Sequence, residues 1–270
     1  MSTAPALYSQ TASTRTQLRR IAGYGPAVIL TVSLLLLWEL AVRAGQISVH
    51  LLPAPSAILQ ALFNNGDIIW TNTIQTLLET VIGLAVATLL GLFLAIVLDI
   101  SFWARRAIYP LLITSQTIPI IALAPLLLIW FGYDIGPKVI VVTLYCFFPI
   151  AVACADGLLA ADPDLMRLLK SMRASRWQIL WLVRLPGAMP SFFSGLRIAA
   201  TYSVTGAIFG EYVGGYQGLG IYMQNAAHSF AIDIVFATIL VTAVLSLLLF
   251  GLVVLIEHIA LPWYHGATTK

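Results

Sequence analysis

The chain has 270 residues, of which 60% are hydrophobic and only 9% are charged, and its formal net charge is +3. A soluble domain carries about a quarter charged residues, so the composition excludes an ordinary soluble domain and predicts an integral membrane protein with one membrane domain. Cys146 and Cys154 lie in or beside an apolar run, without disulfide or metal spacing, and we expect packed free thiols. The four scattered histidines form no metal motif, so no metal site is predicted.

The N-terminal region is polar up to Gln17, and Arg15, Arg19 and Arg20 precede a long apolar run. A signal peptide has a shorter apolar core that ends at a small-residue cleavage site, and this run is long and has no such end. We therefore expect a loose cytoplasmic tail over residues 1–24, followed by an uncleaved membrane helix.

Six apolar segments are long enough to cross a bilayer, which takes about 20 residues. They are residues 26–44, 72–98, 109–131, 138–155, 191–213 and 233–258. The sequence predicts an all-α, polytopic membrane protein. Its membrane domain is expected over residues 25–262, with a cytoplasmic loop over 156–190 and a cytoplasmic C-terminal tail over 263–270.

The distribution of Lys and Arg predicts the orientation of these spans, because both residues favour the cytoplasmic side. With the N-terminus inside, the outside segments contain only Arg43 and Lys138. The inside segments contain Arg15, Arg19, Arg20, Arg105, Arg106, Arg167, Lys170, Arg173, Arg176, Arg184 and Lys270. We therefore predict six spans with both termini in the cytoplasm.

Two outer segments are not simple turns. Residues 50–67 contain Pro53 and Pro55 before a short amphipathic stretch, with Ser56 as a candidate helix cap. Residues 214–233 begin with glycines and continue as a second amphipathic piece. Both are expected to lie flat at the outer interface.

The third span contains two prolines, Pro119 and Pro125, and each removes a backbone hydrogen bond and can kink a helix. Ser115, Gln116 and Thr117 bring polar groups to the same place. Irregular backbone at membrane depth is tolerated where it is buried in protein or lines a cavity, so a polar cavity and a simple steric bend are both open.

Small residues recur every fourth position on the second and fifth spans. The first set is Gly83, Ala87, Gly91 and Ala95, and the second is Gly195, Ala199, Ser203 and Ala207. Small side chains let membrane helices approach closely. We expect the first set to pack within the subunit. The second ends at Glu211, which favours a helix that lines a path or a symmetric interface.

Ionisable groups at membrane depth are costly and are candidates for function. Glu39 has Arg43 four residues on, and Asp99 lies near Arg105 and Arg106, so ion pairs account for both carboxylates.

Two deeper carboxylates leave the choice open. Glu79 fits a wet functional interior and a structural ion pair equally well. Glu211 precedes Gly214 and Gly215. It could contact a substrate or an outer gate, although bonding to the glycine-rich turn is slightly favoured.

The segment 156–190 is too long for a turn and carries the largest basic cluster of the chain. Asp162 and Pro163 predict a helix start, Ser175 predicts a second cap, and Leu185-Pro186 with Pro190 are expected to turn the chain back. A solvated loop, a lipid anchor beside Trp177 and Trp181, and a docking element for a cytosolic partner all fit this pattern.

The stretch LLKSMRASRWQILWLVRLPGAMP resembles the cytoplasmic loop of ATP-binding-cassette importer permeases. The matching positions are Ala174, Ser175, Arg176, Trp177, Gln178, Ile179, Leu185 and Pro186. Two features depart from the pattern of that family: Arg167-Leu168-Leu169 replaces a Glu-Ala-Ala start, and Arg173 stands where Gly is usual.

The resemblance extends over nearly the whole chain. LLPAPSAIL, LLITSQTIPIIALAPLLLIWFG, FFPIAV and SGLRIAATYSVTGAIFGEYVGG are similar to permeases of the nitrate, sulfonate and taurine class. Within that class, SQTIPIIALAPLLLIWFG and GAIFGEYVGG look most like permeases assigned to pyrimidine precursors of thiamine.

The resemblance implies a type I importer permease in the bacterial inner membrane, with a pore formed by two copies of the chain. It implies two cytosolic ATPases and an extracytoplasmic binding protein as partners, and no nucleic acid. The residues implied in ATPase coupling are Met172, Arg173, Ala174, Ser175, Arg176, Trp177, Gln178, Ile179, Leu185 and Pro186.

The chain has no G-x-x-x-x-G-K-[ST] phosphate loop. We therefore expect ATP and Mg²⁺ to be bound by the partner ATPase, and expect no cofactor and no enzymatic activity in this chain.

For a small heterocyclic substrate such as a pyrimidine, aromatic and amide contacts favour Gln116, Pro119, Tyr202 and Glu211 as translocation-path residues. A self-sufficient secondary transporter or channel is the alternative, with Glu79 as the deep carboxylate that such proteins use for coupling ions. A membrane-embedded enzyme ranks last, because the sequence has no metal cluster or serine nucleophile motif.

Overall fold

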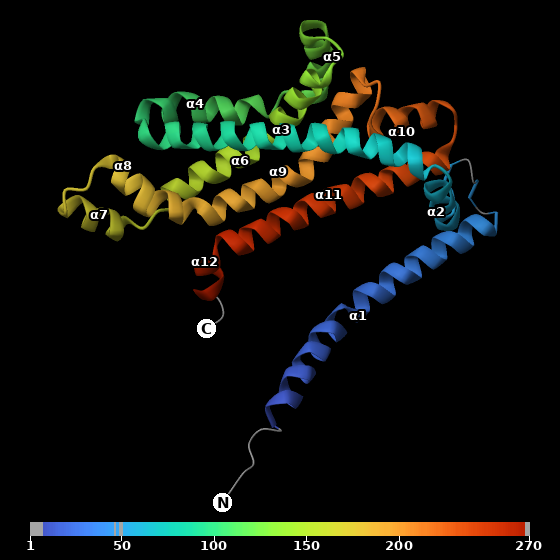
Figure 1. The fold of residues 1–270 in the computed structure, drawn as a ribbon, viewed down its shortest axis with the longest axis horizontal. Helices are drawn as coiled ribbons and strands as arrows, with labels where there is room; N and C mark the ends of the chain where they lie inside the picture. Colours follow the sequence, from blue (N-terminus) through green and yellow to red (C-terminus); the bar gives the residue numbers. More distant parts are fainter. Residues whose placement is uncertain (1–7, 46, 49–50, 268–270) are drawn as a thin grey trace, which may run out of the picture.

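The structure is a computed structural model that describes residues 8–45, 47–48 and 51–267. Throughout this described part, every regular element is a helix. The long helices lie side by side along the long axis of the molecule, and α1 (Tyr8–Arg43) runs away from the others (Figure 1). The predicted all-α class is confirmed.

The chain order of the remaining elements places short helices between long ones. They are α2 (Pro55–Asn64), α3 (Gly66–Ile100), α4 (Phe102–Ser115), α5 (Ile120–Phe131), α6 (Ile135–Leu159), α7 (Pro163–Ser171), α8 (Arg176–Ile179), the π-helix η1 (Leu180–Arg184), α9 (Leu185–Gly214), α10 (Leu219–His228), α11 (Ile232–Ala260) and α12 (Pro262–Ala267).

Among the described residues, five helices are long and apolar enough to cross a membrane: Gly25–Arg43, Gly66–Ile100, Ile135–Leu159, Arg176–Gly214 and Ile232–Ala260. A sixth is present if α4 and α5 form one broken span, and these two helices are bent by 98° relative to each other.

The break between α4 and α5 corrects the prediction of one continuous span over residues 109–131. Pro119 precedes α5 in an extended conformation, at φ −63° and ψ 110°. Proline also drives the residue before it out of the helical region, so the helix ends before Pro119 instead of kinking. Pro125 lies inside α5 without ending it.

The N-terminal helix also starts earlier than expected, at Tyr8 instead of residue 26. Residues 8–22 contain no Gly or Pro to stop a helix, so the stretch expected to be a loose tail is helical from Tyr8 on. Residues 1–7 and 268–270 of the two predicted tails lie outside the described residues.

The expected outer amphipathic pieces form α2 and α10, whereas His50 lies outside the described residues. Ser56 does not cap α2 with its side chain. The carboxylate of Glu39 in α1 accepts bonds from the Ser56 backbone N–H at 3.1 Å and from its hydroxyl at 2.7 Å. The predicted Glu39–Arg43 pair is present at 2.6 Å.

Helix α6 is the centre of the bundle, because it has the most extensive contacts with α9 and α3, and those two helices also contact each other. Gly83 of α3 lies against Val142, and Gly195 of α9 lies against the carbonyl of Pro149, where a Cβ would come within 2.6 Å of the oxygen. Both small-residue sets therefore pack against α6 of the same chain. The small-residue face of α9 therefore contacts α6, so a path or a symmetric interface would use another face of that helix.

The two cysteines are buried free thiols in α6, as expected. Cys146 is fully buried, and its thiol contacts the carbonyl of Ala199 in α9.

Candidate coupling segment and translocation cavity

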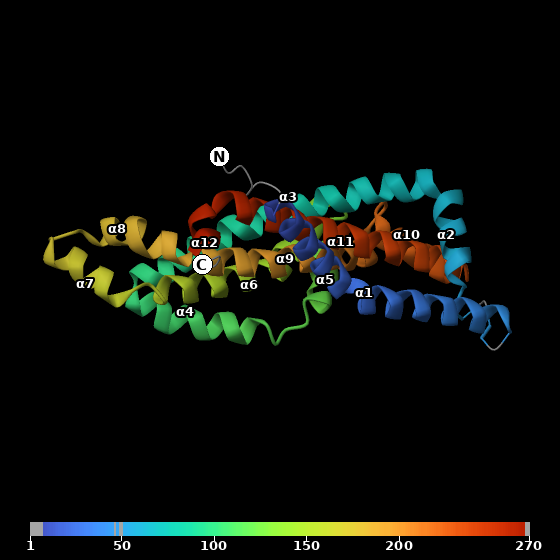
Figure 2. The same ribbon diagram turned by 90° about the horizontal axis from the view of Figure 1, so that it is seen from below.

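The segment between α6 and α9 projects from one end of the bundle as α7 and α8 (Figures 1 and 2). Asp162 caps α7, because its carboxylate accepts a hydrogen bond from the Asp164 N–H at 2.8 Å, and Pro163 occupies the first turn. This confirms the predicted start of the helix.

Two residues after α7 ends at Ser171, Arg173 adopts the left-handed region, with φ 59°. The Ala174 N–H donates to the Leu169 carbonyl at 2.9 Å and the Arg173 N–H donates to the Lys170 carbonyl at 3.0 Å. This is the Schellman arrangement, which favours glycine at the position that Arg173 occupies. The backbone thus gives a physical reason for a glycine there, and Arg173 adopts the same conformation.

Ser175 caps α8 in a reciprocal pair. Its hydroxyl accepts from the Gln178 N–H at 3.2 Å, and the Gln178 side chain accepts from the Ser175 N–H at 2.7 Å. The predicted cap is therefore present as a full capping box.

Contrary to expectation, Leu185-Pro186 and Pro190 do not turn the chain. The helix continues from Arg176 through η1 and α9 to Gly214. A π-turn shifts the backbone hydrogen bonds by one residue, and such a shift accommodates a proline that lacks an N–H. One continuous helix therefore joins α8 to the far end of α9.

The side chains of the coupling segment divide into an anchor and an exposed surface. Ile179 and Leu180 are buried against the bundle, whereas Met172, Trp177 and Trp181 are largely exposed. The segment is thus attached to the bundle on one side and free to contact another protein or a membrane on the other.

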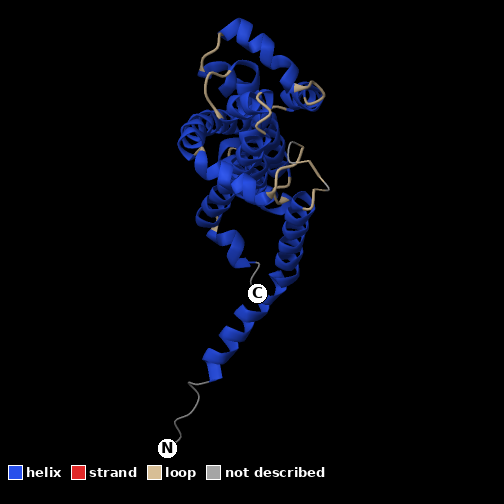
Figure 3. Ribbon diagram, turned by 90° about the vertical axis from the view of Figure 1, so that its right-hand side faces the viewer, coloured by secondary structure: helices blue, strands red, loops and turns tan. Residues whose placement is uncertain are grey.

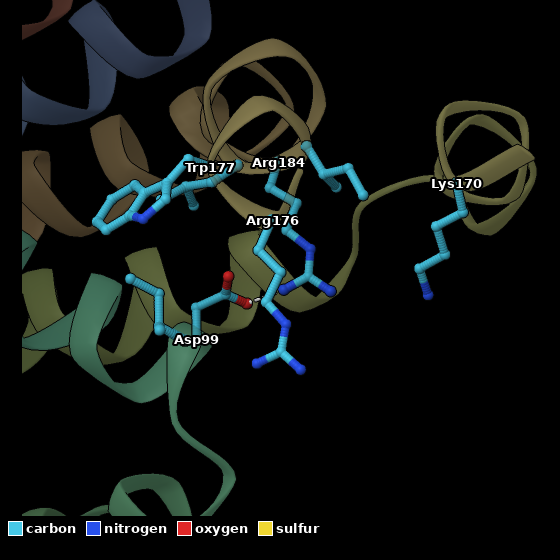
Figure 4. Close-up of a pocket in the computed structure, with 8 residues that line it drawn as sticks. Asp99, Lys170, Arg176, Trp177 and Arg184 are labelled. Atoms are coloured by element: carbon cyan, nitrogen blue, oxygen red, sulfur yellow. Dashed lines mark hydrogen bonds and ion pairs between the residues drawn. The ribbon is translucent and has the colours of Figure 1, made fainter. Parts of the chain in front are cut away.

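An ion pair joins this segment to α3. Arg184 Nη1 in η1 lies 2.5 Å from Asp99 Oδ1 at the end of α3, and the Asp99 side chain is only 5% exposed (Figure 4). The predicted pairing of Asp99 with Arg105 and Arg106 is wrong. Those two guanidinium groups lie over the rings of Tyr109 and Phe102 instead.

A cavity of about 700 Å³ lies among the α4–α5 break, α6 and α9. Three of the four predicted path residues, Gln116, Pro119 and Tyr202, line it. The structure therefore brings together side chains from two distant parts of the chain around one space, as a path would require.

Sequence reasoning missed the wall that α6 contributes. Tyr145, Phe148, Val152 and Asp156 line the same cavity. Their spacing of three and four residues places them on one face of a helix, and that spacing was the signal available in the sequence.

Glu211 lies elsewhere, fully buried at the other end of α9. It accepts hydrogen bonds from the Thr76 hydroxyl at 2.6 Å and from the Gly220 N–H at 2.5 Å, and the Thr76 oxygen accepts from the Leu219 N–H at 2.9 Å. Glu211 is absent from the cavity lining. Its contacts match the structural alternative, in which it holds the glycine-rich turn.

Glu79 belongs to the same buried cluster. Its Oε1 atom lies 3.1 Å from Lys138 Nζ and accepts from the Gln75 amide at 2.8 Å. Lys138, counted among the outside charges at the start of the fourth predicted span, is only 4% exposed. A lysine directly bonded to Glu79 favours the structural ion pair over a coupling-ion site.

The described helices form a bundle with several candidate membrane spans and an exposed basic segment at one end, which defines the class as a polytopic membrane protein. The family model for the inner membrane component of binding-protein-dependent transport systems matches residues 87–258. The chain belongs to this family, whose members are transport permeases and not enzymes. It is a multi-pass protein of the bacterial inner membrane.

Relatives support the assignment over most of the chain. It is 39% identical to a formylaminopyrimidine transport permease of Halalkalibacterium halodurans over 85% of this chain and 92% of that protein. It is 31% identical to the taurine transport permease of Escherichia coli over 89% of this chain and 88% of that protein. The chain is therefore a permease of the nitrate, sulfonate and taurine class of ATP-binding-cassette transporters.

A solved structure shares the fold. The crystal structure of an amino acid ABC transporter with histidines superimposes with a TM-score of 0.61 at 17% identity, and covers 74% of this chain and 97% of that one. Membership of this family implies association with an ATPase and a substrate-binding protein.

Proposed function

We propose that two copies of this chain form the translocation pore of an importer and that each copy is coupled to a cytosolic ATPase through residues 156–190. The partner ATPase binds ATP and Mg²⁺. The observation that carries the proposal is the continuous helix Arg176–Gly214, because it begins in the exposed segment and passes the cavity.

The continuity of this helix gives the coupling a physical route. Trp177 and Gln178 at its start are exposed and available to a partner, whereas Ile198 and Tyr202 further along line the cavity. Because helices are stiff, a displacement of α8 by the ATPase is transmitted to the cavity wall. Interfaces packed this tightly switch between discrete arrangements.

The substrate that fits the cavity best is a small planar heterocycle of the pyrimidine type. Tyr145, Phe148 and Tyr202 offer ring faces and Gln116 offers an amide that both donates and accepts hydrogen bonds. The formylaminopyrimidine permease is among the relatives, which agrees with this substrate class.

Co-purification with the ATPase tests the coupling role. Replacing Ala174, Ser175 and Trp177 by Glu places charge and bulk on the proposed docking surface, and we expect the triple variant to lose the ATPase. Gln217→Glu, an exposed site outside the coupling segment, is the control and is expected to retain it. Unchanged association of the triple variant contradicts the coupling role.

Uptake in vesicles that contain the whole transporter tests the path. Gln116→Ala and Tyr202→Ala are expected to lower pyrimidine uptake, whereas Phe93→Ala, at a 66% exposed position of α3, leaves it unchanged. Ion-driven uptake by the chain without ATPase would support a secondary transporter instead.

A further inference from the structure

A single residue sets the charge of the cavity beside the α4–α5 break. Among the described side chains that line this cavity, only Asp156 is charged. It lies within α6, three residues before that helix ends at Leu159, and it is exposed. The other polar groups of the lining are the amide of Gln116 and the hydroxyls of Tyr145 and Tyr202, which are neutral. The cavity of each chain therefore carries a single negative charge.

The contacts of Asp156 leave this charge uncancelled. Among the described residues, Asp156 forms no ion pair. The hydroxyl of Tyr109 in α4 donates a hydrogen bond to its Oδ1 atom at 3.3 Å. Arg105 lies over the ring of the same tyrosine, 5.9 Å from its centroid, and is not part of the cavity lining. Tyr109 thus holds one carboxylate oxygen, and the other oxygen can accept a hydrogen bond from a solute.

The apolar walls of the cavity strengthen the effect of this carboxylate. Ile118, Phe148, Val152 and Ile198 line the same space. A charge beside low-dielectric walls acts more strongly on a solute than the same charge in open water. Membrane pores use side-chain carboxylates in this way to favour cations over anions. A carboxylate also accepts hydrogen bonds from N–H groups, so it favours solutes that donate them.

We propose that Asp156 makes this cavity select neutral or cationic solutes that carry N–H donors, such as aminopyrimidines, and reject anions such as carboxylates and sulfonates. The proposal rests on the proposed function, because it defines the substrate class of the same path. The amino group donates to Asp156 while the ring packs against Phe148 or Tyr202. A pore of two copies contains two such carboxylates, which increases the repulsion of anions.

Direct binding to the purified permease–ATPase complex in nanodiscs, without the binding protein, tests the proposal. Saturation-transfer NMR measures the weak binding of two probes, an aminopyrimidine and the same compound carrying a carboxylate. We expect the complex to prefer the neutral probe about tenfold, since water at the exposed Asp156 screens part of its charge. Asp156→Asn keeps the shape and removes the charge, and is expected to reduce the preference to about twofold or less.

Uptake is the second measurement, because it follows transport through the whole path. In vesicles that contain the complete transporter, Asp156→Asn is expected to lower ATP-driven uptake of the aminopyrimidine, whereas Asp156→Glu keeps the charge and retains most of it. Asp67→Asn is the matched control. It removes the same charge from an exposed position in the first turn of α3, outside the cavity, and is expected to leave both measurements unchanged.

Each unfavourable result has a distinct meaning. Equal binding of the two probes by the unchanged complex, or an unchanged preference in Asp156→Asn, overturns the selection by charge. An equal loss of preference in Asp67→Asn also overturns it, because net charge would then be the cause. Loss of the ATPase from Asp156→Asn assigns this residue to coupling instead. The proposed path itself fails only if Gln116→Ala and Tyr202→Ala leave uptake unchanged.

Discussion

Two bulky residues hold a backbone conformation that usually belongs to glycine. Arg173 and Phe230 have φ values of 59° and 57°. Phe230 repeats the Schellman bonds described for Arg173: its N–H donates to Ala227 at 3.1 Å, and the Ala231 N–H donates to Ala226 at 2.9 Å. Each costs about 1–2 kcal/mol relative to an ordinary conformation, so the neighbouring helices must fix both turns.

Arg173→Gly is expected to relieve this cost and to stabilise the turn by about 1 kcal/mol, because glycine adopts positive φ freely. Limited proteolysis of the α7–α8 turn measures the effect as a slower rate of cleavage. Arg173→Ala removes the same side chain and keeps the strain, so it should be cleaved faster than Arg173→Gly. Equal rates for Gly and Ala would contradict the argument.

Thr76→Val is expected to destabilise the chain by about 2–4 kcal/mol, because it leaves both the Leu219 N–H and Glu211 short of a buried partner. The apparent melting temperature in detergent and the exchange rate of the Leu219 amide measure it. Thr88→Val is the control, since that hydroxyl bonds only the Leu84 carbonyl of its own helix. A similar loss of stability in both variants would contradict the role of Thr76 in bridging Leu219 and Glu211.

At the scale of elements, sequence reasoning located most long helices because an apolar run is a local property. It could not foresee that Asp99 pairs with Arg184, 85 residues away, instead of the nearby Arg105, since partner choice depends on how helices pack. For the same reason it did not foresee that Lys138, at the start of the fourth predicted span, pairs with Glu79. The rule that prolines end helices did not hold at η1, because the π-helix accommodates the proline that follows it. The continuous helix Arg176–Gly214 was therefore not predicted.

Gly195→Ala is expected to cost about 1–3 kcal/mol, because its Cβ would lie 2.6 Å from the Pro149 carbonyl of α6 and the helices must separate. Gly187→Ala, in the same helix with nothing within 4 Å, is expected to be neutral or slightly stabilising. Thermal unfolding in detergent compares the two. If Gly195→Ala were as stable as Gly187→Ala, close packing of α9 on α6 would be excluded.

Asp99→Asn is expected to destabilise the chain by about 2 kcal/mol, because it leaves the partly buried Arg184 without its counter-charge. Adding Arg184→Gln should recover part of the loss. Asp164→Asn breaks a pair whose side chains are 85% and 79% exposed, and no measurable change is expected there. An additive loss in the double variant would show that Asp99 and Arg184 do not interact.

At the scale of the whole molecule, α1 is the part least supported by the rest of the chain. Only 6% of its apolar window is buried, and Figures 1 and 3 show it diverging from the bundle. The chain therefore presents apolar surface to its surroundings along Gly25–Arg43 of this helix. Lipid or a second copy of the chain can cover it.

Part of the lining of the candidate cavity could be predicted from the sequence. Gln116 and Pro119 drew attention as polar and helix-breaking residues within an apolar run, and they do line it with Tyr202. Glu211 was proposed for its charge, yet its carboxyl oxygens accept the hydrogen bonds that close the outer turn instead of facing the cavity. Whether a buried carboxylate faces a cavity or a backbone N–H depends on tertiary contacts, which a linear pattern does not contain.

The predicted orientation, with both termini in the cytoplasm, can be tested with single cysteines. A membrane-impermeant maleimide applied to intact cells whose outer membrane has been permeabilised should label Gln217→Cys but label Ser171→Cys only after the inner membrane is opened. Both positions are exposed, and the unsubstituted chain is the control because Cys146 and Cys154 are buried. Labelling of Ser171→Cys in intact cells would reverse the topology.

The uninterrupted helix of 39 residues, Arg176–Gly214, has a simple mechanical implication. At 1.5 Å per residue it is a rod about 58 Å long. A tilt of about 5° around its midpoint swings the two tips by about 2.5 Å in opposite directions, by the geometry of such a rod. A displacement of the cytoplasmic tip thus moves the outer tip in the opposite direction. A single tilting helix can therefore open the cavity toward one side of the membrane while it closes the cavity toward the other side.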